Sequence, residues 1–267
     1  MLPTEELQTR ADGFTWYHSI NLGEGVTSKG SKSSQIPLDR FPDFSGRSVL
    51  DIGAWDGYYS FLAERQGASR VVALDHYVWG LDWDARARYW SECQASGTLP
   101  DHSKDATEFW LPDLPGRRAF EFAKETLQSE VEPIVGDFAT MDIGPLGIFD
   151  VVLYLGVLYH MKEPLTCLER LRQVTKHVAV IETATIEVPG FEHENIVQFS
   201  AADELNRDYG NWYMPNVRAI HALCQAAGFS STTTISSTPT ISGPEVVTLL
   251  ERSPAVQIGR AVVHAYV

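Results

Sequence analysis

The chain has 267 residues, 44% of them hydrophobic, which is enough for one large or two small domains with a buried core and excludes a collagen-like or disordered chain. Thirty-five acidic residues against 21 basic ones give a formal net charge of -14. A surface this negative repels the phosphates of nucleic acids, so nucleic acid is an unlikely partner and a small molecule is expected instead.

The cysteines and the N-terminus indicate the compartment. Cys93, Cys167 and Cys224 are odd in number and lack CxxC spacing, so neither a disulfide framework nor a thiolate metal site is predicted. Glu5 and Glu6 lie where a signal peptide would be apolar, and no apolar run approaches the roughly 20 residues of a membrane span. We therefore expect a cytoplasmic protein that does not enter the membrane.

One domain spanning residues 1–267 is expected. Residues 1–45 lack sustained periodicity and predict a covering segment. Strands alternating with helices then predict an α/β fold with a parallel sheet. Buried strands are predicted from short apolar runs at 48–53, 70–75, 149–154 and 178–182, and helices over 58–66 and 164–174.

The interval 76–132 is too long for an ordinary connection. It contains four tryptophans, a proline-rich bend at 111–116 and a predicted helix over 118–128. This aromatic content favours an ordered insertion on the substrate side.

The turn after the first strand is typical of a nucleoside site. Gly53 and Gly57 allow a ligand to approach the backbone, and Asp75, at the end of the second strand, can accept hydrogen bonds from ribose hydroxyls. The G-x-G-x-x-G spacing of dinucleotide sites is absent, and Asp51 and Asp56 would repel a pyrophosphate. Such a turn suits S-adenosylmethionine, with its sulfonium and ammonium groups; the alternative is an α/β turn that binds no ligand.

Two later segments fit the same ligand. Asp137 follows the third strand, where an acid can bind the adenine amino group, and residues 154–160 end the fourth strand, facing the sulfonium. Ligands of open α/β sheets lie outside the carboxyl ends of the strands, so one crevice is predicted. The predicted cofactor-binding residues are Asp51, Gly53, Ala54, Gly57, Asp75, His76, Gly136, Asp137, Phe138, Leu155, Gly156 and Tyr159.

These segments resemble class I S-adenosylmethionine-dependent methyltransferases. The GVLYH segment at 156–160, the NWYMPN segment at 211–216 and the WYH segment at 16–18 are similar to the branch of bacterial tRNA wobble-uridine carboxymethyltransferases and their small-molecule relatives, over residues 14–252. The resemblance implies a Rossmann-like, seven-stranded, mostly parallel sheet with one reversed strand. It places the final hairpin near 232–235 and 246–251.

The resemblance also bears on the substrate. In the tRNA enzymes a lysine, the tyrosine of the GVLYH segment and a C-terminal arginine hold a carboxylated cofactor. Tyr159 matches the tyrosine, Lys29 and Lys32 are candidates for the lysine, and no arginine aligns. The tryptophan-rich insertion instead resembles methyltransferases of bacterial polysaccharide and natural-product pathways. This favours ordinary S-adenosylmethionine and O-methylation of a saccharide or small natural product, with a tRNA wobble-uridine modifying (carboxy)methyltransferase as the alternative.

Methylation of a hydroxyl needs a group that accepts its proton. The predicted catalytic residues are His160 beside the expected methyl position, His18 in the covering segment and Glu182 ending the fifth strand. His160 could instead orient a loop, and His18 could be a packing residue. A non-catalytic binding module of the same fold is a third possibility, but it predicts a degenerate cofactor turn, and this turn is intact.

Metal assistance is a further alternative. Glu182, His193 and Glu194 could together hold Mg²⁺, which would lower the pKa of the hydroxyl.

Aromatic residues are expected to line the acceptor pocket, because their flat faces hold sugar rings and aglycones. The predicted substrate-binding residues are Trp16, Tyr17, Trp79, Trp83, Trp212 and Tyr213. The sequence leaves the oligomeric state open, with a homodimer as one option.

Overall fold

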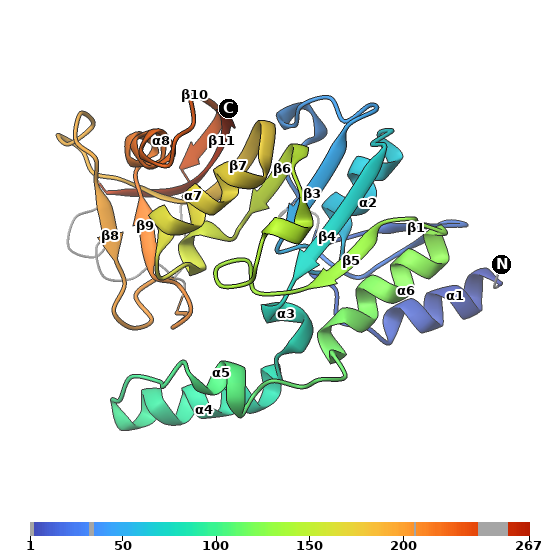
Figure 1. The fold of residues 1–267 in the computed structure, drawn as a ribbon. Coiled ribbons are helices and arrows are strands. Elements are labelled where there is room, and N and C mark those ends of the chain that lie inside the picture. The colour runs from blue at the N-terminus through green and yellow to red at the C-terminus, as the bar shows by residue number, and fades with distance from the viewer. Residues whose placement is uncertain (1–2, 32–34, 206, 240–255) are drawn as a thin grey trace. The chain divides into compact units, whose positions relative to one another are not determined.

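The computed structural model describes residues 3–31, 35–205, 207–239 and 256–267. Contacts divide the chain into two compact units, unit 1 (residues 1–138) and unit 2 (residues 139–267) (Figure 1). Among the described residues, no helix is both long enough and apolar enough to cross a membrane.

Unit 1 is built on three parallel strands in the order β3-β4-β5. Their inner positions, such as Val49, Leu50 and Val72, are fully buried, as expected for strands covered on both faces. The elements of the unit outside the insertion are α1 (Thr4–Asp12), β1 (Asn21–Gly23), β2 (Val26–Thr27), η1 (Leu38–Arg40), β3 (Ser48–Ile52), α2 (Tyr58–Arg65), β4 (Arg70–Asp75), α6 (Arg118–Leu127) and β5 (Glu132–Val135).

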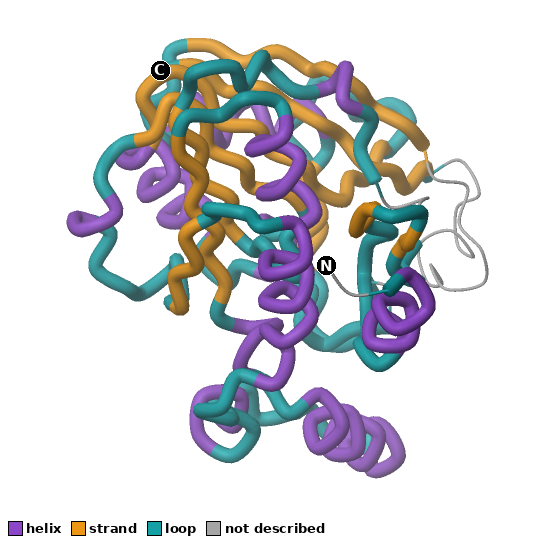
Figure 2. The backbone as a smooth tube through the Cα atoms, turned by 90° about the vertical axis from the view of Figure 1, so that its right-hand side faces the viewer, coloured by secondary structure: helices purple, strands orange, loops and turns teal. Residues whose placement is uncertain are grey.

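The insertion carries α3 (Tyr77–Gly80), α4 (Trp83–Ser96), α5 (Lys104–Thr107) and η2 (Pro115–Arg117). Helices α4 and α5 lie clear of the strands of unit 1 (Figures 1 and 2). Arg86 of α4 is buried, forms a 2.8 Å ion pair with Asp105 of α5 and lies 3.5 Å from the centre of the Trp90 ring. A buried arginine needs both its charge and its donors satisfied, so this contact joins the two helices firmly.

Unit 2 contains four strands in the order β10-β11-β7-β6, and β11 runs antiparallel to both of its neighbours. Two short strands, β8 and β9, pair separately. Its elements are η3 (Gly144–Leu146), β6 (Phe149–Leu155), η4 (Leu158–His160), α7 (Pro164–Val174), β7 (Thr175–Glu187), β8 (Val197–Phe199), β9 (Tyr213–Pro215), α8 (Val217–Ala226), β10 (Ser231–Pro239) and β11 (Gln257–Tyr266).

The predicted Rossmann-like α/β sheet is confirmed. In the described part of the chain it has seven strands, and β11 is the one that is reversed. Of the predicted final hairpin, 232–235 lies within β10, whereas 246–251 lies outside the described residues; β10 pairs with β11 instead. Helix α1 was not predicted, because few of its side chains, among them Leu7 and Ala11, are buried.

The position predicted for Glu182 needs a correction. It does not end the fifth strand, because β7 continues to Glu187. The reason is that β11 pairs with β7 along this whole stretch, from Val178 to Glu187, so the ladder extends beyond the apolar run that marks the strand in the sequence.

Gly57, which precedes α2, is predicted to tolerate no side chain. Its φ is +82°, and a Cβ would lie 2.6 Å from the rings of Phe61 and Phe120. We expect Gly57→Ala to lower the free energy of unfolding by about 2–5 kcal/mol, from left-handed strain and overpacking together. Urea denaturation measures this loss.

Gly97→Ala is the matched control. Gly97 also has a left-handed φ of +67°, but a Cβ there would meet nothing within 4 Å. We expect Gly97→Ala to lower the free energy of unfolding by the conformational strain alone, about 1–2 kcal/mol. Equal losses in the two variants would contradict the packing explanation.

Candidate active site

The turn between β3 and α2 is held in place by the neighbouring strand β4. The backbone N–H groups of Gly53 and Ala54 both donate to the Leu74 carbonyl, at 2.8 and 3.2 Å. Trp55, in a left-handed conformation, donates its N–H to Asp75 at 2.9 Å and accepts at its carbonyl from the Trp79 indole at 2.7 Å. The turn is therefore fixed on both sides, with Gly53 exposed at its tip.

Two carboxyl groups beside this turn are almost completely buried. Asp51 is 2% exposed and accepts a 2.6 Å bond from the Ser60 hydroxyl, while Asp75 is 3% exposed and accepts from the N–H groups of Trp55 and Val78. Burial raises the pKa of each carboxyl to about 6, although these hydrogen bonds act in the opposite direction. Buried acids with raised pKa values are typical of sites that bind donors or cations.

The end of β5 adds the third predicted segment of unit 1. The N–H of Gly136 donates to the Asp75 carbonyl at 3.1 Å, which places Asp137 next to the end of β4. Burial lowers the pKa of His76, and the charge of Asp137 opposes that effect. Unit 1 thus brings together, around the carboxyl ends of β3, β4 and β5, the predicted residues Asp51, Gly53, Ala54, Gly57, Asp75, His76, Gly136, Asp137 and Phe138.

The insertion contributes a residue that the sequence interpretation missed. The Trp110 ring stacks on the His76 ring, with centroids 4.3 Å apart and an interplanar angle of 14°. Gly80 permits the approach of Trp110, because a Cβ at Gly80 would lie 1.9 Å from the indole. The tryptophan-rich composition was the available signal, but it did not single out Trp110.

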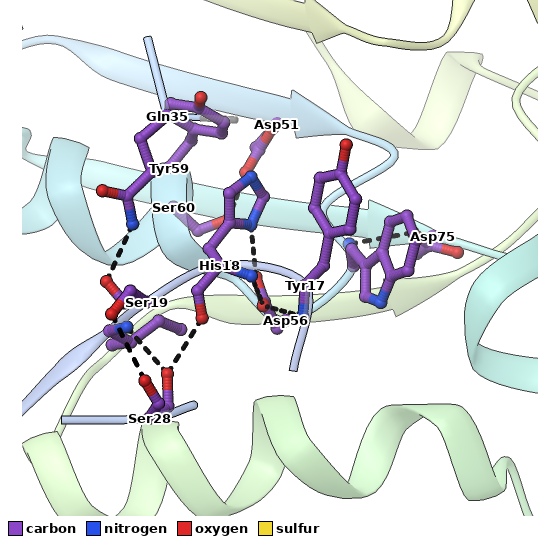
Figure 3. A network of polar contacts seen from close by, with 12 residues as sticks. Tyr17, His18, Ser19, Ser28, Gln35, Asp51, Asp56, Tyr59, Ser60 and Asp75 are labelled. Carbon is purple, nitrogen blue, oxygen red and sulfur yellow. Dashed lines mark hydrogen bonds and ion pairs between the residues drawn. The ribbon is translucent and has the colours of Figure 1, made fainter. Parts of the chain in front are cut away.

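The N-terminal segment is tied to the turn through Asp56 (Figure 3). The fully buried Asp56 carboxylate accepts from the backbone N–H groups of Tyr17 (3.0 Å) and His18 (2.6 Å), and lies 2.7 Å from His18 Nδ1. The Tyr17 ring stacks on Trp55 at 4.1 Å. The predicted cover therefore contacts the turn through Tyr17 and His18.

In unit 2, η4 follows β6 and carries Tyr159 and His160. The N–H of Gly156 donates to the Glu182 carbonyl at 2.9 Å, and Gly156 is left-handed at φ +71°. His160 Nδ1 lies 2.9 Å from the Gly210 carbonyl, which can only accept, so Nδ1 carries the proton. The backbone N–H of Trp212 donates to the Tyr159 carbonyl at 2.7 Å, so η4 is joined to the loop before β9.

Glu182 is engaged by an arginine that the sequence interpretation did not identify. Arg260 of β11 donates to both carboxylate oxygens of Glu182, through Nε and, at 2.7 Å, through Nη2. Burial alone would lower the pKa of Arg260, but the bond to Glu182 raises it overall. The guanidinium also lies 5.3 Å from the centre of the Tyr159 ring. Because Arg260 occupies both carboxylate oxygens, we do not retain Glu182 as a catalytic base.

The predicted magnesium ligands are not brought together. No group of three or more His, Cys, Asp or Glu side chains with metal-binding geometry occurs in the described ranges. Glu182 is occupied by Arg260, and His193 and Glu194 are exposed. The metal alternative is therefore not carried further.

The predicted acceptor-binding aromatics fall into two groups. Trp79 is fully buried, and Trp16 is 7% exposed with its indole N–H bonded to the Ala11 carbonyl, so both belong to the core. Tyr17 and Trp83 are 41% and 39% exposed. In unit 2, Trp212 and Tyr213 are half-buried.

The comparison with protein families identifies the chain. A family model described as "Methyltransferase domain" matches residues 34–234. The chain belongs to this family. It is a class I S-adenosylmethionine-dependent methyltransferase.

Its curated relatives include tRNA U34 carboxymethyltransferases. The methyltransferase is 28% identical over 189 residues to that of Pseudomonas savastanoi pv. phaseolicola, with 70% of this chain and 47% of the relative covered. It is 23% identical over 215 residues to that of Actinobacillus succinogenes, with 80% and 55% covered. The chain thus spans about half the length of these relatives.

Solved structures show the same fold. The N-terminal domain of EvdMO1 with SAH bound superposes with a TM-score of 0.65 at 20% identity and covers 100% of this chain and 98% of its own. That domain was also crystallised in the presence of SAH and D-fucose (TM-score 0.64, 19% identity, 100% and 97% covered). CrArsM, an arsenic(III) S-adenosylmethionine methyltransferase from Chlamydomonas reinhardtii, gives a TM-score of 0.54 at 14% identity, with 100% and 71% covered.

The residues of unit 1 fit this cosubstrate. Asp51 and Asp75 are buried carboxyl groups beside the exposed Gly53, and they would be the acceptors for the hydroxyl and ammonium donors of S-adenosylmethionine. When bound, the cosubstrate supplies an electrophilic methyl group.

Binding of SAH, the demethylated product, should weaken in acid. The pKa values of Asp51 and Asp75 are raised to about 6, so both groups become protonated below pH 6 and must lose their protons to accept donors from the ligand. We expect the SAH dissociation constant to rise by about tenfold or more from pH 7.5 to pH 5. Below its pKa, each carboxyl group can raise this constant by up to about tenfold per pH unit. Isothermal titration calorimetry measures this, and a constant affinity would contradict it.

Asp75→Asn tests which carboxyl is responsible. We expect it to weaken SAH binding at pH 7.5 by about 1.5–3 kcal/mol, the value of hydrogen bonds to a charged acceptor, and to flatten the pH dependence. Asp43→Asn is the control, because Asp43 also accepts a backbone N–H, at 3.0 Å from Ser45, but is exposed. Equal effects of the two substitutions would rule out a specific role for Asp75.

Proposed function

We propose that this methyltransferase transfers a methyl group to a hydroxyl of a saccharide or small natural product. The observation that carries the proposal is the pair formed by His18 and the buried Asp56 beside the cofactor turn. A hydroxyl is too weak an acid to react unaided at neutral pH and needs a positioned base. His160, with its Nδ1 proton on the Gly210 carbonyl, is the second candidate for that base.

Surface chemistry supports a small, uncharged acceptor. The net charge of -14 disfavours a polyanionic substrate. Exposed or half-buried aromatic rings, Tyr17 and Trp83 in unit 1 and Trp212 and Tyr213 in unit 2, offer faces on which a sugar ring can stack. EvdMO1, crystallised in the presence of D-fucose, makes sugars one acceptor class to test.

The proposal treats the chain as a single methyltransferase domain. Residues 1–45 form its N-terminal cover, and residues 76–132 form its substrate-side insertion. The family match over residues 34–234 extends across both units and supports this organisation. The predicted cofactor-binding residues of unit 1, with Leu155, Gly156 and Tyr159 of unit 2, remain part of the proposal.

A methyl-transfer screen tests the function. The enzyme is incubated with S-adenosylmethionine labelled on its methyl group, a panel of methyl glycosides and fractionated lysate metabolites, with and without EDTA. We expect label in an O-methyl product and equal rates in both conditions, because a histidine can accept the proton without a metal. Label found only on nitrogen or on RNA would reject the O-methyltransferase.

One contact favours a second function, carboxymethyl transfer to the tRNA wobble uridine. Arg260 lies beside Tyr159, as expected if the two residues held a carboxylated cofactor. However, Glu182 already binds this guanidinium through both of its carboxylate oxygens, and Lys29 is bonded to Asp12 at 2.7 Å. The other candidate, Lys32, lies outside the described residues. A cofactor carboxylate would have to compete with Glu182, so we rank this function second.

Arg260→Leu separates the two functions. For the O-methyltransferase, we expect the enzyme to bind S-adenosylmethionine at least as tightly as its carboxylated form, and the variant to show no selective loss for the carboxylated form. A tenfold or larger selective loss in calorimetry would support carboxymethyl transfer instead. Arg172→Leu is the control, since Arg172 donates to the Gly228 carbonyl and pairs with no predicted site residue.

A further inference from the structure

We propose that His18 and Asp56 act as a catalytic pair, in which His18 accepts the proton of the acceptor hydroxyl and Asp56 is the positioning residue that holds the imidazole. The inference rests on the proposed O-methyltransferase function and names the group that moves the proton. Its basis is the geometry of Asp56, a residue to which the sequence analysis gave no catalytic role.

Asp56 fixes the imidazole through its side chain and its backbone at once. Its carboxylate accepts the backbone N–H of His18 at 2.6 Å and lies 2.7 Å from Nδ1 (Figure 3). A carboxylate only accepts, so Nδ1 carries the proton, and a neutral ring held in this way has its lone pair at Nε2. Because the Asp56 side chain is fully buried, water cannot compete for this bond.

The second nitrogen of His18 is available to a substrate. Within the described part of the chain, no hydrogen bond uses Nε2, and Nε2 is not among the buried polar atoms that lack a partner. His18 as a whole is nevertheless only 6% exposed. With Nδ1 occupied by Asp56, Nε2 is the ring nitrogen at which His18 can accept a proton.

The backbone of His18 is also held from the other side. The Ser28 hydroxyl donates to the His18 carbonyl at 2.9 Å, and the Ser31 N–H donates to the Tyr17 carbonyl at 2.9 Å. Gly30 packs so closely that a Cβ would lie 2.0 Å from the His18 carbonyl oxygen. These contacts leave the imidazole little freedom to leave Asp56, so the pair is preorganised.

Besides Asp56, the titratable groups near His18 in the described part of the chain include Asp51 and three tyrosines. Asp51 of β3 interacts with His18 through its charge, and its own hydrogen bond is to Ser60. Tyr58 of α2 stacks on the imidazole at 5.1 Å, while Tyr59 and the neighbouring Tyr17 approach it edge-on.

His160 has a different partner and is given a different role. Its Nδ1 proton goes to the carbonyl of Gly210, a neutral acceptor in the loop before β9. The Gly210 carbonyl orients the ring of His160, whereas Nδ1 of His18 has a buried carboxylate as its partner. We therefore assign the proton transfer to His18 and the positioning of this loop to His160.

The proton and electron balance of the step is simple. The acceptor oxygen forms a bond to the methyl carbon while the carbon–sulfur bond breaks, and that electron pair stays on sulfur. The hydroxyl proton passes to Nε2 of His18, and the resulting imidazolium is stabilised by Asp56. Release of this proton to water restores the neutral ring, so no other reactant is needed.

The first test is NMR of the enzyme labelled with ¹⁵N-histidine and saturated with SAH. We expect the neutral form of His18 to carry its proton on Nδ1. The signals of His18 are assigned from their loss in His18→Gln. Asp56→Asn should reverse the tautomer, because an asparagine that accepts the backbone N–H groups cannot also accept from Nδ1. An Nε2–H tautomer in the wild type, or unchanged signals in Asp56→Asn, would overturn the inference.

The second test is kinetic, with the acceptor found in the methyl-transfer screen. We expect His18→Ala and Asp56→Asn each to lower kcat by about 10² or more and to leave SAH affinity within about threefold. The double variant should lose little more than either single one, because the two residues act as a unit. Asp56→Asn should also shift the pH profile of kcat, which a purely structural role would not do.

Asp12→Asn is the matched control. Asp12 holds the same N-terminal segment through its 2.7 Å bond to Lys29 but does not contact His18. We expect wild-type kcat and an unchanged pH profile. If Asp56→Asn fails to fold, His18→Gln carries the kinetic arm, because it leaves Asp56 with both of its backbone donors.

The outcomes separate the two proposals. Wild-type kcat in His18→Ala, or additive losses in the double variant, would overturn the catalytic pair while O-methylation stands. A wild-type enzyme that methylates no hydroxyl in the screen would overturn both.

Discussion

The main-chain path of unit 1 depends on buried carboxylates. Hydrogen bonds from backbone N–H groups replace the water that these carboxylates lose on burial. Burying an ionised group is costly unless hydrogen bonds replace its hydration. Asp56 obtains them from Tyr17 and His18, and Asp75 from Trp55. Each acid therefore determines the path of the main chain beside it. The N-terminal cover and the cofactor turn are positioned by the same kind of contact, and the proposed chemistry lies between them.

The same physics explains why two histidines in similar chemical settings are assigned different roles. Both have Nδ1 on an oxygen acceptor, so both are held in one tautomer. The acceptor at Nδ1 of His18 is a buried carboxylate, which can stabilise a positive ring, and the acceptor at Nδ1 of His160 is the Gly210 carbonyl. Burial strengthens the difference, because the interaction between charges grows as solvent is removed.

In unit 2 a single ion pair removes two of the functions that the sequence suggested. The bidentate contact of Arg260 with Glu182 occupies both oxygens of that carboxylate. With both oxygens held by Arg260, neither is left for a substrate proton or a metal ion, so neither the Glu182 base nor the magnesium site is retained. The pair also places an arginine next to Tyr159, which gives the carboxymethyl alternative its one structural support.

The sequence by itself determined the elements whose signal is local. The apolar run at 70–75 predicted β4, and the three-residue spacing of leucines predicted α7, both with the observed bounds. The glycine and acid spacing predicted that Gly53 and Asp75 lie together at one end of unit 1, because parallel strands bring their carboxyl ends to one edge. Periodicity is a property of neighbours along the chain, and these features need nothing more.

The tertiary structure alone decided which side chains become partners or stay accessible. Asp56 lies 38 residues from His18, and Arg260 lies 78 residues from Glu182, so no spacing along the chain reveals either pair. Trp79 and Trp83 are four residues apart, yet one is fully buried and the other is 39% exposed. Burial and pairing depend on packing between distant segments, and that packing is absent from any short stretch of sequence.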